Sequence, residues 1–228
     1  MSTSTSVTGL SAVVTGGQRG LGKAIVTELL ARGAAKVYAT SRQPTAAADP
    51  RIVSVGLDVT DDQSVAALAH IAADATLLVN NAGLFGGQSL TSSPLAEIES
   101  VLDTNFYGTL RVTRQFLPVL EANGGAATIV NIASVLSWLP TSGAYGCSKA
   151  ALWSATNSLR LELAPRHIHV VGVYLGYTDT SMVSDLNVPK NDPADVARQV
   201  VDGIESGAAE VIADEFTRQA RASVFPRQ

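Results

Sequence analysis

Seven short apolar runs, separated by stretches that suit helices, constrain the fold of this chain more than any other feature. The runs are rich in Val, Ile, Leu and Ala, and they cover Ser11–Thr15, Lys36–Thr40, Ile52–Val55, Thr76–Asn80, Ala127–Ile132, Ile168–Tyr174 and Glu210–Ala213. Strands that are apolar on both faces are typical of a parallel sheet covered by helices on its two sides. The sequence therefore predicts an α/β fold: one doubly wound parallel sheet of about seven strands with helices on both faces.

Helix-start signals and the lack of an interdomain linker complete this prediction. Three helix starts are expected at a capping-box pattern of Thr60 with Gln63, at Ser93 before Pro94, and at Asp192 before Pro193. The chain contains no second-domain linker and no internal repeat, so a single domain over residues 1–228 is expected, with residues 1–7 as a disordered tail.

Composition excludes several classes of partner. The net charge is −4, so the chain lacks the basic field that nucleic acid or an anionic membrane attracts. The first residues lack the pattern of a secretory signal and no apolar run is long enough for a membrane helix, so we expect neither. Cys147 is the single cysteine, which fits a reducing compartment, and a cytoplasmic location is expected. His70, His167 and His169 lack metal-ligand spacing, so no metal site is predicted.

A glycine-rich segment joins the first predicted strand to the first predicted helix. It reads Thr-Gly-Gly-Gln-Arg-Gly-Leu-Gly over residues 15–22, and a helix follows over Lys23–Arg32. Glycines let the backbone approach a pyrophosphate, which the free N–H groups and the positive dipole end of the helix attract. The segment by itself indicates only a tight turn with capacity for a phosphate.

The spacing of Gly16, Gly20 and Gly22 resembles the Thr-Gly-x-x-x-Gly-x-Gly pattern of the short-chain dehydrogenase/reductase family. Five further segments occur in the order that this family has, and they are Asp58-Val59, Asn80-Asn81-Ala82-Gly83, Asn105, Tyr145-x-x-x-Lys149, and Gly176 with Thr180. The resemblance covers nearly the whole chain and implies a Rossmann-like fold that binds a nicotinamide dinucleotide.

The resemblance also assigns cofactor contacts. It implies that Asp58 contacts the adenine, that the Asn81 region borders the ribose, and that Thr178 and Thr180 contact the nicotinamide amide. Taken singly, Asp58 is equally a turn residue and Asn81 a strand cap. The predicted cofactor-binding set is Gly16, Gln18, Arg19, Gly20, Leu21, Gly22, Ser41, Arg42, Asp58, Val59, Asn81, Ala82, Gly83, Tyr145, Lys149, Thr178 and Thr180.

The end of the second predicted strand indicates which dinucleotide binds. An enzyme that uses NAD places an acid there to accept hydrogen bonds from the ribose hydroxyls. Here the segment after Thr40 reads Ser41-Arg42, without an acid, and Arg19 lies in the glycine loop. Two guanidinium groups suit a 2′-phosphate, so NADPH is the predicted cofactor, and two solvated surface arginines are the alternative.

Tyr145 and Lys149 lie four residues apart on a predicted helix, so their side chains share a face. A neighbouring ammonium favours the phenolate and lowers the pKa of a tyrosine. The resemblance implies that Tyr145 protonates the substrate carbonyl, that Lys149 holds the ribose hydroxyls, and that Ser134 hydrogen-bonds the substrate oxygen. It further implies that Asn105 supports a water that relays protons to Lys149.

The chain departs from the family pattern at two places. Ser134 lies two residues closer to Tyr145 than the family's usual spacing, so the loop over residues 135–144 is short, and Ser137 is the competing candidate for the substrate serine. We expect the shortening to move Trp138 and Leu139 to a new position over the pocket. Leu175 stands where the family commonly has Pro before Gly176, which leaves that turn less rigid.

The predicted substrate pocket is apolar. Its expected wall comprises Phe85, Trp138, Leu139, Tyr177 and Met182, together with Leu84, Val183 and Leu186. Met182 and Leu186 suit the core equally well. Loops at the carboxyl ends of strands carry these residues, and ligands bind there in doubly wound sheets.

These features predict an NADPH-dependent oxidoreductase that transfers a hydride between the nicotinamide and a small-to-medium hydrophobic ketone, aldehyde or secondary alcohol. The alternative is a non-catalytic NADP(H)-binding regulatory protein on the same fold. A dehalogenase on this fold needs no nucleotide, and the complete glycine motif disfavours it. The resemblance also implies a homo-oligomer, a tetramer or a dimer, paired through the long helices after Ser93 and around Tyr145.

Overall fold

A seven-stranded parallel sheet forms the centre of the computed structural model, which describes residues 6–123 and 127–224. The strands are β1 (Ser11–Val14), β2 (Lys36–Ser41), β3 (Ile52–Gly56), β4 (Leu77–Asn80), β5 (Ala127–Ile132), β6 (Ile168–Tyr174) and β7 (Glu210–Ile212). Their order in the sheet is β3-β2-β1-β4-β5-β6-β7, and every pair is parallel. The predicted doubly wound sheet is confirmed, with strand ends within one residue of the predicted ones.

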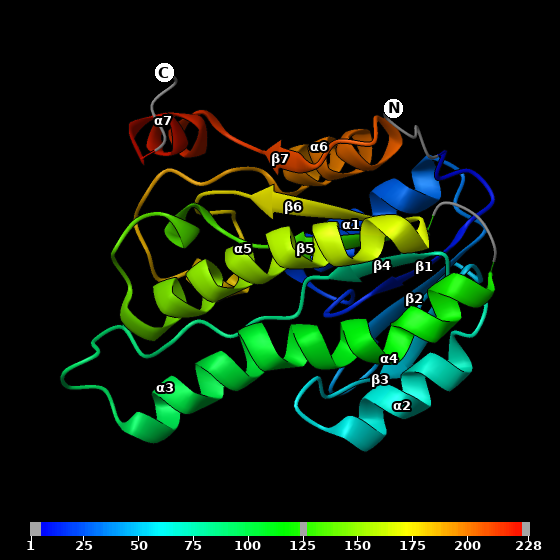
Figure 1. Ribbon diagram of the computed structural model, residues 1–228, viewed down its shortest axis with the longest axis horizontal. Coiled ribbons are helices and arrows are strands. Elements are labelled where there is room, and N and C mark those ends of the chain that lie inside the picture. Colours follow the sequence, from blue (N-terminus) through cyan, green and yellow to red (C-terminus); the bar gives the residue numbers. More distant parts are fainter. Residues whose placement is uncertain (1–5, 124–126, 225–228) are drawn as a thin grey trace.

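Helices cover both faces of the sheet (Figure 1). The α-helices are α1 (Gly20–Ala31), α2 (Asp62–Ile71), α3 (Leu95–Leu102), α4 (Gly108–Ala122), α5 (Gly143–Leu163), α6 (Pro193–Glu205) and α7 (Glu215–Val224). Helices α1 and α6 pack together on one face, while α2, α4 and α5 cover the other. Helix α3 continues into α4 through a π-helical turn, Asp103–Tyr107.

Alternation along each strand divides the core into two layers. In β1, Ala12 and Val14 pack among the residues of α1 and α6, whereas Val13 packs on the α2 and α4 side. Successive side chains of a strand point to opposite faces of the sheet, so a strand that is apolar at every position is buried on both faces.

Two predicted helix starts were wrong by one residue. Asp61, not Thr60, caps α2, because its carboxylate accepts the 2.8 Å hydrogen bond from the backbone N–H of Gln63. Pro94 itself occupies the N-cap position of α3 in an extended conformation. The start of α6 is confirmed: Asp192 accepts from Ala194 N at 2.8 Å, and Pro193 is the first helical residue.

The predicted tail over residues 1–7 ends too late. Residues 1–5 lie outside the described residues, but Val7 is fully buried in the layer beneath α1 and α6.

Within the described ranges, no helix has the length and apolar character needed to span a membrane. The same ranges hold no group of His, Cys, Asp and Glu side chains suited to a metal ion.

The sheet reverses its strand order between β1 and β4. The segments that follow β1 to β6 all leave from the same side of the sheet, where the carboxyl ends of the parallel strands lie. A crevice forms at such a switch point because the neighbouring connections leave in opposite directions. These segments line a cleft of about 640 Å³.

Candidate active site

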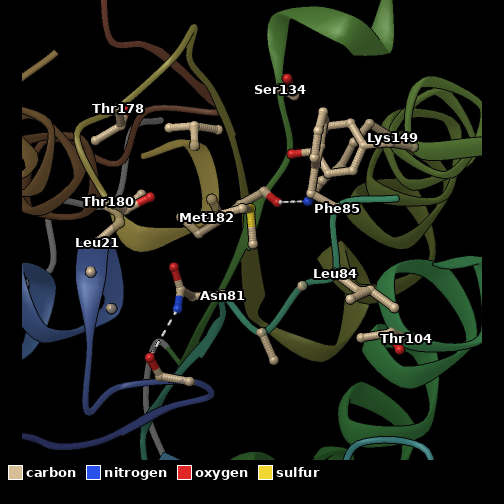
Figure 2. Close-up of a pocket in the computed structure, with 18 of the residues that line it drawn as sticks. Leu21, Asn81, Leu84, Phe85, Thr104, Ser134, Lys149, Thr178, Thr180 and Met182 are labelled. Atoms are coloured by element: carbon tan, nitrogen blue, oxygen red, sulfur yellow. Dashed lines mark hydrogen bonds between the residues drawn. The ribbon is translucent and has the colours of Figure 1, made fainter. Parts of the chain in front are cut away.

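The glycine loop forms one wall of the cleft. Thr15 accepts hydrogen bonds at its hydroxyl from the backbone N–H groups of Asn81 and Ala82, both at 2.9 Å. Asn81 donates from Nδ2 to the carbonyls of Thr15 (2.9 Å) and Gly16 (3.3 Å), as Figure 2 shows in part. These bonds join the loop after β1 to the loop after β4 across the switch point.

Close packing explains the glycine at position 22. A Cβ atom there would lie 2.3 Å from the Gly16 carbonyl oxygen and 2.5 Å from Asn81 Nδ2, closer than atoms pack. Helix α1 starts beside this contact, and its N-cap residue Arg19 gives no side-chain cap to the first N–H groups. The uncapped helix start opens toward the cleft and suits a pyrophosphate.

Charged side chains line the part of the cleft that the segments after β1, β2 and β3 form. Arg19, Arg42 and Asp58 line it there. Asp58 accepts from Thr60 through both its hydroxyl (2.7 Å) and its backbone N–H (2.9 Å). These bonds, with smaller contributions from Arg42 and Arg111, lower the pKa of Asp58. Asp58 is thus both a turn residue and part of the cleft.

Gln18 does not line the cleft, in contrast to its predicted place in the cofactor-binding set. Its Oε1 accepts from Ser41 Oγ (3.0 Å) and Thr45 N (2.9 Å), and its Nε2 donates to Thr45 O (3.0 Å). Gln18 therefore holds the end of β2 and the segment that follows. The other sixteen residues of the predicted set all line the cleft.

The opposite end of the cleft contains Ser134, Tyr145 and Lys149. In Figure 2, Ser134, Phe85 and Lys149 lie across the pocket from Leu21, Thr178 and Thr180. Helix α5 carries Tyr145 and Lys149 on one face, and Lys149 Nζ lies 5.6 Å from the centroid of the Tyr145 ring. The Phe85 ring contacts the Tyr145 ring edge to face, at 5.0 Å between centroids.

Burial dominates the ionisation of Tyr145 and Lys149. It raises the pKa of Tyr145 to about 12, with a smaller opposing effect from a hydrogen bond with Ser134. Burial also lowers the pKa of Lys149 to about 8. The protein's own groups therefore leave Tyr145 a weaker acid than a free phenol, contrary to the expected lowering by Lys149. At neutral pH Tyr145 carries its proton and is available as a donor.

The structure distinguishes the two candidate serines. Ser134 lines the cleft, while Ser137 is buried outside its lining and donates from Oγ to the backbone carbonyl of Lys149 at 3.0 Å. The short loop is accommodated by a 3-10 turn at Val135–Ser137, which leaves Ser134 at the end of β5.

Asn105 lies outside the cleft lining, although it was predicted to be catalytic. It occupies the π-helical turn, where its Oδ1 accepts from Leu84 N (2.7 Å) and its Nδ2 donates to Leu84 O (2.9 Å) and Ser148 Oγ (2.9 Å). These three bonds engage the side-chain amide with the protein. Asn105 joins the loop after β4 to helix α5 and positions both.

Trp138 is misplaced in the predicted substrate pocket. It is only 9% exposed, stacks on Tyr174 at 4.6 Å between ring centroids, and has the Arg221 guanidinium over its ring at 5.7 Å. The short loop thus turns Trp138 into the core rather than over the pocket. Phe85, Leu139, Tyr177 and Met182 line the cleft, as do Leu84 and Val183, whereas Leu186 does not.

Several lining residues were not predicted. They are Thr40, Leu57, Thr60, Ser100, Thr104, Ile132, Ala133, Val135, Leu136, Thr141, Leu175, Gly176, Ser181 and Phe216. Ser100 of α3 and Thr104 of the π-helical turn lie four residues apart, so both face the cleft from the same side of this helical segment. Phe216 belongs to α7, far along the chain from every motif, and no local pattern indicated it.

A doubly wound parallel sheet with a cleft at its switch point is the arrangement of dinucleotide-binding domains. The family model described as short chain dehydrogenase matches residues 11–191, and the chain belongs to the short-chain dehydrogenase/reductase family.

Known relatives agree with this assignment. The chain is 31% identical to the ketoacyl reductase HetN of Nostoc sp., over 92% of this chain and 80% of that protein. It is similar to a crystal structure of a short chain dehydrogenase from Burkholderia cenocepacia in complex with NADP, with 34% identity and a TM-score of 0.88 over 97% of this chain and 100% of the other. The NADP complex of RhlG from Pseudomonas aeruginosa has 28% identity and a TM-score of 0.81, over 91% and 95% of the two chains.

Proposed function

We propose that this protein is an NADP-dependent carbonyl reductase or alcohol dehydrogenase that acts on small-to-medium hydrophobic ketones, aldehydes or secondary alcohols. The distribution of charge along the cleft carries the proposal. Arg19, Arg42 and Asp58 lie after β1, β2 and β3, while the lining after β4 and β6 is apolar at Leu84, Phe85, Tyr177 and Met182. One end suits a phosphorylated nucleotide, and the other suits an uncharged substrate.

The residues present fit the dinucleotide. The uncapped start of α1 supports a pyrophosphate, and Arg19 with Arg42 supports a 2′-phosphate. Among the described residues, Lys149 Nζ makes one hydrogen bond, to Ile132 O at 2.8 Å, which leaves two of its three donors for ribose hydroxyls. The Burkholderia and Pseudomonas proteins were solved with NADP, which supports the same cofactor here.

When bound, the dinucleotide supplies the hydride. Tyr145 donates its phenolic proton to the carbonyl oxygen of the substrate, which becomes the alcohol oxygen. Ser134 orients that oxygen with a hydrogen bond and stabilises the charge that develops on it. The edge of Phe85 fixes the Tyr145 ring, and the apolar lining excludes water from the reacting carbon.

A carbonyl panel tests the function. Purified protein with NADPH should oxidise the nucleotide only when a hydrophobic ketone or aldehyde is present. Tyr145→Phe should lower this rate by about 10²-fold or more, because it removes the proton donor and keeps the ring. Tyr107→Phe, at an exposed position in the π-helical turn, is the control and should keep full activity.

Two outcomes would count against the enzyme. Tight NADPH binding without turnover of any carbonyl would favour the non-catalytic regulator, and full activity of Tyr145→Phe would exclude the mechanism. We also propose that the chain forms a homo-oligomer, which the exposed apolar side chains Leu95 on α3 and Leu161 on α5 support. Sedimentation analysis measures it directly.

A further inference from the structure

The carboxylate of Asp214 joins the start of its own helix α7 to two segments that are distant in the sequence. Its Oδ2 accepts from the backbone N–H of Gly176 at 2.7 Å and from Asn191 Nδ2 at 3.1 Å. Its Oδ1 accepts from the backbone N–H of Thr217 at 2.8 Å and so caps the start of α7. Asp214 follows β7, is partly buried and does not line the cleft.

The first of these segments is the turn after β6. Leu175, Gly176 and Thr178 of this turn line the cleft, and Leu175 stands where a proline would fix the backbone. Hydrogen bonds restrain the turn from two sides instead. Val135 N donates to Leu175 O at 2.9 Å, and Gly176 N donates to Asp214. The restraint at Gly176 depends on the carboxylate.

The second segment is the long loop that carries Met182. Asn191 N donates to Tyr177 O at 2.8 Å, and Asp179 N donates to Asn191 O at 2.9 Å, so Asn191 closes this loop at its base. The Asn191 side chain then reaches Asp214. A single carboxylate therefore fixes the turn after β6 and the base of the loop that covers the same end of the cleft.

We propose that Asp214 is a positioning residue that aligns the nicotinamide end of the cleft through Gly176 and Asn191. This inference rests on the proposed function, which places the nicotinamide beside Thr178 and Thr180. Three N–H donors point at the side chain of residue 214, and a carboxylate accepts hydrogen bonds at both oxygens without donating any. The position therefore requires a carboxylate. An asparagine would direct its NH₂ group at one or more of these donors.

The variant Asp214→Asn tests the positioning of Gly176 and Asn191 separately from the capping of α7. Asparagine is a good N-cap, so its oxygen retains the bond from Thr217 while its NH₂ group faces Gly176 and Asn191. We expect Asp214→Asn to weaken NADPH binding by about tenfold, as expected for loss of a charge-assisted hydrogen bond, and to lower kcat by a similar factor through misalignment. Binding of 2′,5′-ADP, which lacks the nicotinamide, should not change.

Two further variants complete the experiment. Asn191→Ala should give a smaller loss of NADPH affinity, and the double variant should bind no worse than Asp214→Asn alone, because both substitutions break the same connection. Asp192→Asn is the matched control: Asp192 also caps a helix with its carboxylate, at α6, and lies outside the cleft. It should leave the affinity for both ligands and kcat unchanged.

Titration calorimetry with NADPH and with 2′,5′-ADP, together with steady-state kinetics, decides the question. Equal weakening of both ligands by Asp214→Asn would overturn the inference, and so would unchanged NADPH affinity and kcat. Wild-type protein that binds neither ligand would instead contradict the proposed cofactor. The two failures are therefore distinguishable.

Discussion

Lys149 Nζ donates a 2.8 Å hydrogen bond to the backbone carbonyl of Ile132 at the end of β5. The lysine is 5% exposed, and burial lowers its pKa from 10.5 to about 8. Across the part of the chain that the structure describes, no carboxylate forms an ion pair with this ammonium. The charge therefore costs folding free energy, on the order of 3 kcal/mol at neutral pH.

Lys149→Met should make the protein more stable and inactive. At pH 7 we expect the free energy of unfolding to rise by about 1–3 kcal/mol, because the buried charge is removed while the stem still packs. Urea denaturation measures this change. Lys23→Met, at an exposed position of α1, is the control and should change stability little. A large loss of stability in Lys149→Met would show that the ammonium stabilises the fold.

The advantage of Lys149→Met should shrink as the pH rises. The folded pKa is about 8 and the unfolded pKa is 10.5, so between these values the unfolded wild-type chain binds more protons than the folded one. The contribution of Lys149 to the free energy of unfolding of the wild-type protein therefore rises from pH 8 toward pH 10.5. Between pH 7 and 9.5 the difference between the two proteins should fall by about 2 kcal/mol. A pH-independent difference would contradict the lowered pKa.

Arg42→Ala should reduce the preference for NADPH. The Arg42 guanidinium lines the cleft after β2, and the neighbouring position holds Ser41 rather than an acidic residue. Loss of one charge-assisted contact with the phosphate removes about 1.5–3 kcal/mol of binding free energy. NADPH affinity should fall by about tenfold or more, while NADH affinity changes little. Arg114→Ala, at an exposed position of α4, should affect neither. Equal losses for both cofactors would show that Arg42 does not read the 2′-phosphate.

Ser134→Ala and Ser137→Ala should have opposite consequences. Ser134 lines the cleft, so its loss should lower kcat/KM by roughly 10–10³-fold through the missing hydrogen bond to the developing alkoxide. Ser137 bonds the Lys149 carbonyl within the core, so its loss should lower the free energy of unfolding by about 1 kcal/mol and leave kcat/KM nearly unchanged. Kinetics on one ketone, with thermal unfolding of both variants, checks this. The reverse pattern would make Ser137 the substrate serine.

Gly143→Ala should be strongly destabilising. Gly143 begins α5 with φ of +51°, and a Cβ atom there would lie 2.2 Å from the Gly87 carbonyl oxygen. The short loop before α5 thus packs its backbone directly on the loop after β4. We expect a loss of roughly 2–4 kcal/mol, measured by urea denaturation. Ser142→Gly is the control: Ser142 has φ of +63°, which glycine adopts freely, so stability should not fall by more than a few tenths of a kcal/mol.

The sequence by itself determined the sheet and most of the cleft. Strand periodicity depends only on neighbouring residues, and the runs ending at Asn80 and Ile132 match β4 and β5 at their carboxyl ends. Because parallel strands deliver these ends to one edge, motifs that follow them must meet there. The sequence alone accordingly places Arg42, Ser134 and Tyr145 in one cleft, as the structure has them.

Tertiary structure alone decided which side chains near the motifs face the cleft. Gln18 forms hydrogen bonds with Ser41 and Thr45. The Asn105 amide bonds to Leu84 and Ser148. The Trp138 ring stacks on Tyr174. Each partner is close in space but is not recognisable from sequence spacing, because a buried polar or aromatic group takes whichever partner the packing provides.

The C-terminal segment shows the same limit most clearly. Phe216 enters the cleft, and Asp214 reaches Gly176, 38 residues earlier in the chain. Neither residue belongs to a local pattern, since both act through the docking of β7 and α7 against the turn after β6. Local rules determine where strands and helices begin and end, whereas long-range packing determines which side chain completes the site.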